Sequence, residues 1–131
     1  MPPLNHAVLS ASSAYRWLEC PPSALATADI PDETTIYAQE GSAAHEMAEY
    51  KIRWHLGEKD LAPPNIGNFN AEEIDRYTDS YAYYVTDKIE TIRKTCPNAI
   101  VMVEQRLDFS NYVKDGFGTG DLVIVADDVL Q

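Results

Sequence analysis

A histidine in the first half of the chain has carboxylates close to it in the sequence. His45 lies in the stretch Glu40–Glu49, and Glu46 and Glu49 follow it within about one helical turn. An imidazole nitrogen beside carboxylate oxygens suits Mn²⁺ well, whereas Mg²⁺ prefers oxygen ligands. His45 is therefore a candidate metal ligand. The alternative is a structural histidine at the edge of a helix, a common use of this residue.

Two acidic residues near the predicted strands are further candidates. Asp121 follows Gly118-Thr119-Gly120 and opens an apolar run, where a buried carboxylate needs a partner or a metal. Its alternative role is to cap the turn before the strand. Glu104 interrupts an apolar strand, so it either faces solvent or turns toward a site. If the fold brings these carboxylates to His45, they could bind a metal ion that activates a water molecule to attack a phosphodiester.

The element that positions His45 is predicted to be a helix over residues 42–56. Ser42 is its expected N-cap, and Gly57 follows its last turn, as glycine often does. Apolar residues recur at steps of four and predict the buried face: Ala44, Ala48, Ile52 and Leu56. His45 lies one position from this stripe, at the border of the buried surface.

A longer helix is predicted over residues 71–94, with Asn70 as its N-cap. Glu72 and Glu73 in its first turn, and Arg93 and Lys94 in its last, have the signs that the helix dipole favours. Its expected packing face consists of Ile74, Tyr77, Tyr81, Tyr84, Val85, Ile89 and Ile92. Tyrosines also suggest base stacking, but packing with the hydroxyls near water is the simpler account.

The remaining pattern predicts a short N-terminal helix and several strands. The helix begins near Ser10 or Ser12 and ends before Cys20-Pro21; its Arg16 either contacts a phosphate or is only solvated. After Cys96-Pro97 the apolar residues recur at every second position, which predicts strands over 100–107, 122–126 and 129–131. We expect one α+β or α/β domain over residues 1–131. Its helical part, residues 10–94, packs on the first strands of a mixed sheet formed by residues 100–131.

Composition limits the classes of function. The 131 residues carry a formal net charge of −11, which argues against a broad basic surface for nucleic acid but leaves room for a metal site. This charge also suits a non-catalytic acidic interaction module, or a mimic of nucleic acid, that docks a basic partner. The two cysteines, Cys20 and Cys96, predict neither a disulfide framework nor a zinc site. No signal peptide or membrane span is recognisable, so we expect a cytoplasmic protein.

Four blocks in order carry a resemblance to a known family. They are Leu9-Ser-x-Ser-x-x-x-x-Trp-x-x-Cys-Pro21, Glu40-Gly-x-x-x-His45-Glu, Val103-Glu-x-x-Leu107 and Gly118-Thr-Gly-Asp121. Together they resemble the RecB-like branch of the PD-(D/E)XK nuclease superfamily. More closely, the chain is similar to a phage- and prophage-associated domain family of that branch with no assigned function.

The resemblance implies a restriction-endonuclease-like core and metal-dependent cleavage of DNA. His45 and Asp121 match the positions that bind Mg²⁺ or Mn²⁺, and Glu104 is a weaker match. The family's third block, an acid-x-Lys on the next strand, does not follow Asp121, and no lysine lies beyond Lys114. We therefore expect a core that is truncated at its C-terminus and inactive by itself. An open sheet edge would then favour a homo-oligomer.

Overall fold

The computed structural model describes residues 7–31, 33–127 and 129–130. The chain divides into two compact units, and each is described by itself. One unit comprises Met1–Glu33 and Gln105–Gly120, and the other comprises Thr34–Glu104 and Asp121–Gln131. Among the described residues, no helix combines the length and the apolar character needed to cross a membrane.

The unit that contains the N-terminus is built from short helical turns and the outer ends of two strands. A 3-10 turn, η1 (Ala11–Ser13), leads into α1 (Ala14–Glu19), and α2 (Ser23–Ala26) follows. The predicted N-terminal helix is confirmed, but no serine side chain caps it. Instead, the indole Nε1 of Trp17 donates to the carbonyl oxygen of Ser10 at 2.9 Å and closes the turn.

The helix that carries His45 is longer than predicted. This helix, α3 (Ile36–His55), begins after Thr35, whose Oγ1 accepts a hydrogen bond from the backbone N–H of Ala38 at 3.1 Å. Ser42 is therefore not the N-cap; it lies inside the helix and its hydroxyl donates to the carbonyl of Ala38. Once Thr35 starts the helix, each further residue adds a backbone hydrogen bond, and Gly41 costs only about 1 kcal/mol.

The following helix, α4 (Ala71–Thr95), begins at the predicted residue. The Oδ1 of Asn70 accepts from the backbone N–H of Glu73 at 3.2 Å, which confirms Asn70 as the N-cap. The predicted packing face is only partly correct. The residues buried on α4 are Ile74, Thr78, Ala82, Val85 and Ile89, whereas Tyr77 and Tyr84 are 60% and 61% exposed. The smaller Thr78 and Ala82 thus take the buried positions that we assigned to tyrosines.

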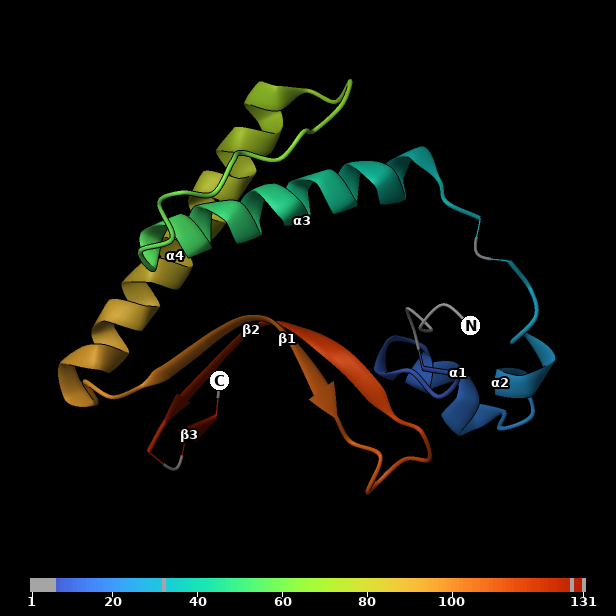
Figure 1. The fold of residues 1–131 in the computed structure, drawn as a ribbon. Coiled ribbons are helices and arrows are strands. Elements are labelled where there is room, and N and C mark those ends of the chain that lie inside the picture. Colours follow the sequence, from blue (N-terminus) through green and yellow to red (C-terminus); the bar gives the residue numbers. More distant parts are fainter. Residues whose placement is uncertain (1–6, 32, 128, 131) are drawn as a thin grey trace. The chain divides into compact units, whose positions relative to one another are not determined.

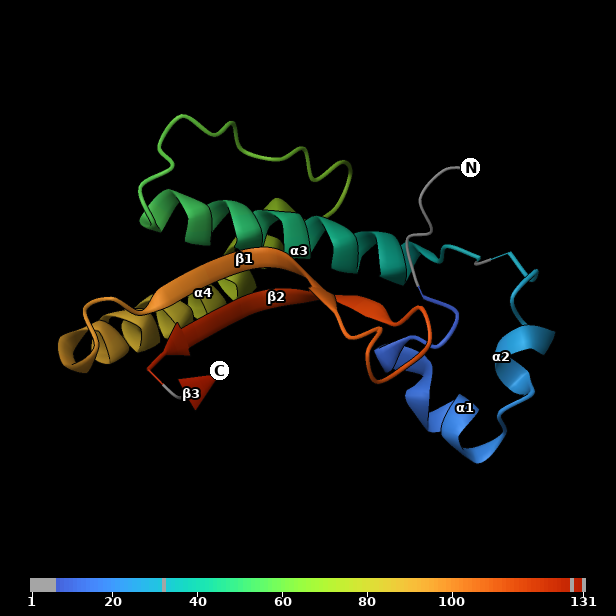
Figure 2. The same ribbon diagram turned by 60° about the horizontal axis from the view of Figure 1, so that its bottom comes forward.

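The strands β1 (Ile100–Asp108), β2 (Phe117–Ala126) and β3 (Val129–Leu130) form a sheet in that order. β2 and β3 pair antiparallel, with Val125 opposite Leu130. In Figures 1 and 2, β1 and β2 lie side by side and run in opposite directions. The α+β class is confirmed. The strands among residues 100–126 and 129–130 are antiparallel and do not include the parallel pair that a mixed sheet requires.

The core of the second unit joins both long helices to the sheet. Ile52 of α3 and Ile124 of β2 are each 2% exposed, and they cluster with Ala82, Val85 and Ile89 of α4. Full burial of one such isoleucine contributes about 1.5–3 kcal/mol to the stability of the fold.

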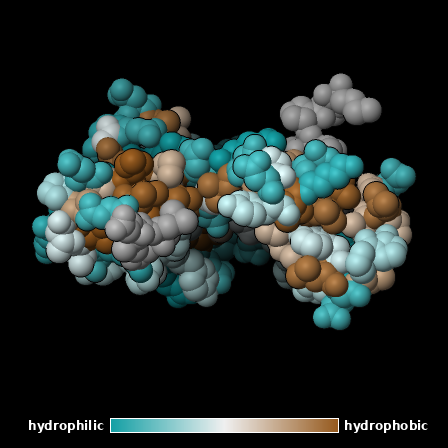
Figure 3. Space-filling view, turned by 90° about the horizontal axis from the view of Figure 1, so that it is seen from below, coloured by the Kyte–Doolittle hydropathy of each residue, from teal (hydrophilic) through white to brown (hydrophobic). Residues whose placement is uncertain are grey.

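Seen from the strand side, a group of apolar side chains gathers at the left of the picture (Figure 3). Ile100, at the start of β1, is 57% exposed.

Candidate metal centre

Three elements of the second unit bring the predicted ligands to one place. His45 and Glu49 lie one turn apart on α3, and Glu104 comes from β1. One ligand atom from each of these three residues lies within 4.8 Å of the other two. The His45 Nε2 contacts the Glu104 Oε1 directly, and the Asp121 Oδ1 of β2 lies 4.0 Å from the same nitrogen. One imidazole and three carboxylates therefore converge.

Glu104 reaches this position through an unusual backbone conformation. Its φ is +53°, which places a non-glycine residue of β1 in the left-handed region. This conformation costs roughly 1–2 kcal/mol, and such strain is found most often at functional sites. The strand keeps Glu104 partly buried, with 23% of its side chain exposed beside His45. No glycine, asparagine or turn motif in the sequence predicts a left-handed backbone at this position.

The convergent side chains line a cavity of about 310 Å³. Its other lining residues are Gly41, Ala48, Ile52, Tyr81 and Val103. The side chains of His45 and Asp121 are 42% and 68% exposed, so water and solutes reach them. The exposure of Asp121 corrects the argument from burial that first singled it out. Its closeness to His45, and not desolvation, is what places it at this site.

Arg53 holds one of the three carboxylates. Its Nε donates to the Glu49 Oε1 at 2.8 Å, and its guanidinium also reaches the Val103 carbonyl oxygen at 3.2 Å and Glu58 at 3.4 Å. The hydrogen bond to Glu49 is the largest cause that raises the pKa of Arg53. Arg53 thus orients Glu49, offsets part of the negative charge, and connects α3 to β1.

Tyr81 of α4 faces the same carboxylates. Burial raises the pKa of its hydroxyl first, and the negative charges of Asp121 and Glu104 raise it further. We assigned Tyr81 to packing from the sequence and missed its place at the site. Arg53 was also missed, although the i, i+4 spacing of Glu49 and Arg53 is a recognisable ion-pair signal.

Other predicted residues lie away from this cavity. Glu46 is exposed on α3 and does not belong to the convergent group. Arg16 lies in the N-terminal unit, where its guanidinium donates to the Thr27 hydroxyl at 3.3 Å. Cys20, in the N-terminal unit, and Cys96, at the end of α4, are free thiols.

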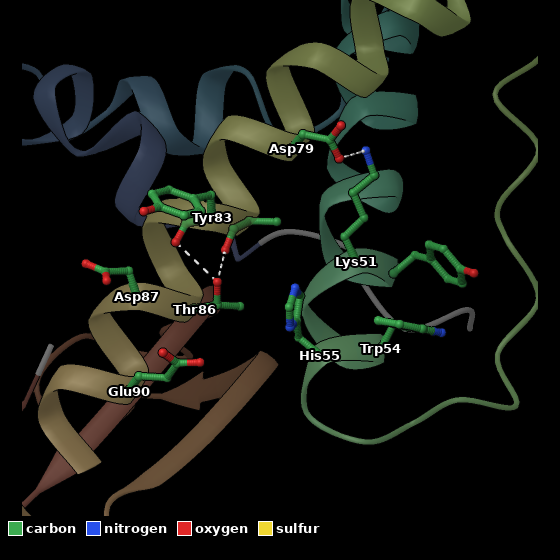
Figure 4. Close-up of a pocket in the computed structure, with 10 residues that line it drawn as sticks. Lys51, Trp54, His55, Asp79, Tyr83, Thr86, Asp87 and Glu90 are labelled. Carbon is green, nitrogen blue, oxygen red and sulfur yellow. Dashed lines mark hydrogen bonds and ion pairs between the residues drawn. The ribbon is translucent and has the colours of Figure 1, made fainter. Parts of the chain in front are cut away.

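A larger cavity, of about 600 Å³, lies between α3 and α4 and holds none of these ligands (Figure 4). Lys51 and Asp79 border it and form an ion pair of 2.6 Å. Lys51 also donates to Asp75 and to the Thr78 hydroxyl, so it ties α3 to α4. Desolvation lowers the pKa of Lys51, but hydrogen bonds and charge from the two aspartates outweigh it, and the net pKa is raised. This lysine is a structural link.

The donor set of the smaller cavity fits a divalent ion of intermediate hardness. Carboxylate oxygens alone would suit Mg²⁺ or Ca²⁺, and cysteine ligands would favour Zn²⁺. One imidazole nitrogen among carboxylates is a donor set that Mn²⁺ accepts, and Zn²⁺ accepts it as well.

Comparison with known proteins gives one family. The model of a family described as "Protein of unknown function (DUF2800)" matches residues 6–131. No solved structure matches the chain.

Proposed function

The chain belongs to the DUF2800 family, and from its site and its RecB-like resemblance we propose that it is part of a metal-dependent DNA nuclease of phage or prophage origin. The reaction would be hydrolysis of a phosphodiester bond. His45, Glu104 and Asp121 would hold Mn²⁺ or Mg²⁺, and Glu49 would complete the set. The observation that carries the proposal is the convergence of a helix histidine with acids from two successive strands.

The order of these elements supports the RecB-like resemblance. A histidine on a helix precedes a strand with an acid, and the next strand supplies the aspartate, as the resemblance implies. We also propose that the complete protein has a restriction-endonuclease-like core. The described α3, α4, β1 and β2 are compatible with such a core, because helices cover one face of the sheet.

Each residue of the site would have a separate task. The His45 Nε2 and the carboxylates of Glu104 and Asp121 are the donors, and Arg53 keeps Glu49 turned toward them. Tyr81 lies at the edge of the cavity, where its hydroxyl can donate to a phosphate oxygen. A bound divalent ion would polarise the phosphate and make water a better nucleophile.

The test is a cleavage assay on the protein translated from the complete gene, with Mn²⁺ or Mg²⁺ added to single- and double-stranded DNA. The acid-x-Lys block does not follow Asp121 in these 131 residues, so we expect this chain alone to bind metal without cleaving. In the complete protein, Asp121→Asn should reduce cleavage on the order of 100-fold. His55→Ala, on the same helix as His45, is the control. Full activity of Asp121→Asn would refute the proposal.

A second candidate function rests on charge. The net charge is −11, and α4 exposes many acids away from the metal centre: Glu72, Glu73, Asp75, Asp79, Asp87 and Glu90. We infer that such a surface could dock a basic protein or imitate nucleic acid. A stoichiometric basic partner in a pull-down from host lysate, together with no effect of Mn²⁺ on stability, would favour this function over the nuclease.

A further inference from the structure

A row of exposed tyrosines runs along α4 past the metal centre. Tyr77, Tyr81 and Tyr84 are spaced i, i+4 and i+7, so they lie on one face of the helix. Their exposed fractions are 60%, 39% and 61%. Large aromatic side chains exposed in a row are unusual on a soluble surface and commonly mark a binding site. The helical spacing predicts that these three tyrosines pack, whereas the structure leaves them exposed.

Cations border the tyrosine row at both ends. The Arg76 guanidinium lies 5.1 Å from the centre of the Tyr77 ring, and the Lys88 Nζ lies 5.8 Å from the centre of the Tyr84 ring. Lys88 also continues the same helix face, at i+11 from Tyr77. Guanidinium and ammonium groups beside aromatic rings are the usual partners of a nucleic-acid strand.

Most acids of α4 point away from the tyrosine row. Asp75 and Asp79 bind Lys51 on the side that faces α3. Asp87 and Glu90 border the larger cavity (Figure 4). Glu73 lies one turn before Tyr77, and Glu72 and Glu73 line a small pocket together with Arg76. The row is therefore an aromatic surface with a cation at each end, and the carboxylates of Glu104 and Asp121 border its middle at Tyr81.

Tyr81 belongs both to the tyrosine row and to the lining of the metal centre. It lines the same cavity as His45, Glu104 and Asp121, while Tyr77 and Tyr84 lie one turn to either side of it on α4. A linear ligand that lies along the row would thus have its middle at the metal centre and its ends over the two outer rings. With a divalent ion among these carboxylates, the arrangement would fit a polymer with regularly spaced flat groups and anionic links.

We propose that the tyrosine row binds single-stranded DNA, with bases stacked on Tyr77 and Tyr84, and presents the phosphodiester between them to the His45–Glu104–Asp121 centre. This inference rests on the proposed nuclease function and specifies its substrate. Arg76 and Lys88 would lie near the backbone phosphates on either side.

The geometry favours a single strand over a duplex. Successive tyrosines rise about 6 Å and 4.5 Å along the helix axis, more than the ~3.4 Å between stacked bases of one strand in a duplex. Rings at this spacing reach bases only when the strand is unstacked. In addition, two flanking cations are too few to hold a duplex by its phosphates against the surrounding negative charge.

The binding experiment measures fluorescence anisotropy of a fluorescein-labelled oligo-dT with the 131-residue chain in MnCl₂, because the proposal places the phosphodiester at the metal centre. The double variant Tyr77→Ala/Tyr84→Ala should weaken binding on the order of tenfold per ring. Tyr77→Phe/Tyr84→Phe should keep nearly full affinity, because the rings remain. The matched control is Tyr83→Ala: Tyr83 is 75% exposed on the same helix but borders the larger cavity. A duplex containing the same strand should bind at least tenfold more weakly.

Salt dependence gives an independent readout. Contacts to two or so phosphates predict a slope of about −1 to −2 in log K against log salt for a single strand. Undetectable oligo-dT binding, equal affinity for the duplex, or equal losses in the Tyr83 control and the Tyr77/Tyr84 variant would each overturn the inference. The last two outcomes would indicate non-specific binding, and the first would point to a protein ligand for the row.

Metal binding separates the failure of this inference from the failure of the proposed function. Tyr77→Ala/Tyr84→Ala should retain the full Mn²⁺-induced rise in Tm, since neither residue lines the metal cavity. If Mn²⁺ stabilises the chain but oligo-dT does not bind, the nuclease proposal stands and the substrate inference falls. If oligo-dT binds and Mn²⁺ has no effect, the metal centre and the nuclease fall, and the row is a binding surface only.

Discussion

Replacing His45 by alanine should remove most of the stabilisation that Mn²⁺ gives to this chain. His45 is the one nitrogen donor of the convergent group, and its Nε2 contacts Glu104 and lies 4.0 Å from Asp121. Its side chain is 42% exposed, so its removal leaves no sizeable cavity. We therefore expect the metal-free variant to unfold within about 1 kcal/mol of the wild type.

The size of the effect follows from mass action. A ligand present at about 100 times its Kd stabilises the folded state by ~2.7 kcal/mol. For a domain of this length, 1 kcal/mol corresponds to roughly 3–5 °C in Tm, so saturating Mn²⁺ should raise Tm by about 10 °C. Loss of a ligand that weakens binding about 100-fold leaves ~0.4 kcal/mol at the same Mn²⁺ concentration, or about 1–2 °C.

The assay is thermal unfolding followed by circular dichroism, with and without MnCl₂, and titration calorimetry at one temperature confirms the affinities. His55→Ala is the matched control, because His55 is exposed at the end of α3 and lies outside the convergent group. An equal Mn²⁺ shift in His45→Ala and wild type would remove His45 from the site. A loss of the shift in His55→Ala would show that the ion binds elsewhere on α3.

Further predictions test the local structure. Thr35→Ala should destabilise the chain by about 1 kcal/mol through loss of the N-cap, while Ser42→Ala in the helix interior should be neutral or slightly stabilising; urea unfolding compares the two, and the reverse order would refute the observed start of α3. Lys51→Met should cost about 1–2 kcal/mol at pH 7, because it removes charge-assisted bonds between α3 and α4. The pKa of Lys51 is raised above 10.5 in the folded state, so this difference is complete below pH 10.5 and should shrink as the pH rises through the higher folded value; a pH-independent difference would contradict the ion-pair account. The free energy of unfolding should be about 1 kcal/mol higher for Glu104→Gly than for Glu104→Ala, the reverse of the usual order in a strand, because only glycine adopts the left-handed region without strain. Both variants should lose Mn²⁺ binding by calorimetry. A more stable Glu104→Ala variant would argue against the observed φ.

Local signals in the sequence were sufficient for several elements. Asn70 is followed by two glutamates and a helical apolar period, and the structure begins α4 at the next residue. The change to a period of two after Cys96-Pro97 predicts β1 and β2. These features depend on backbone hydrogen bonds and side chains within a few residues, so the sequence states them directly.

Local signals could not decide the start of α3 or the buried face of α4, because in each case two alternatives have similar energies. Thr35 and Ser42 are both good N-caps, and the choice of Thr35 depends on the extra helical turns that it makes possible. On α4, a tyrosine face and a face with Thr78 and Ala82 have similar helical spacing. The smaller residues are the ones that become buried because α4 packs against α3. At this contact the Lys51 ammonium donates to the Thr78 hydroxyl at 2.8 Å.

The sequence by itself determined the types of the site residues and their order along the chain, because a histidine on a helix and acids on two strands can be read from pattern alone. Only the tertiary structure decided that Glu104 and Asp121 reach His45, that Arg53 holds Glu49, and that Tyr81 faces the cavity. Distances between residues far apart in sequence depend on how α3, α4 and the sheet pack. They depend as well on the left-handed backbone of Glu104, which no local propensity predicts.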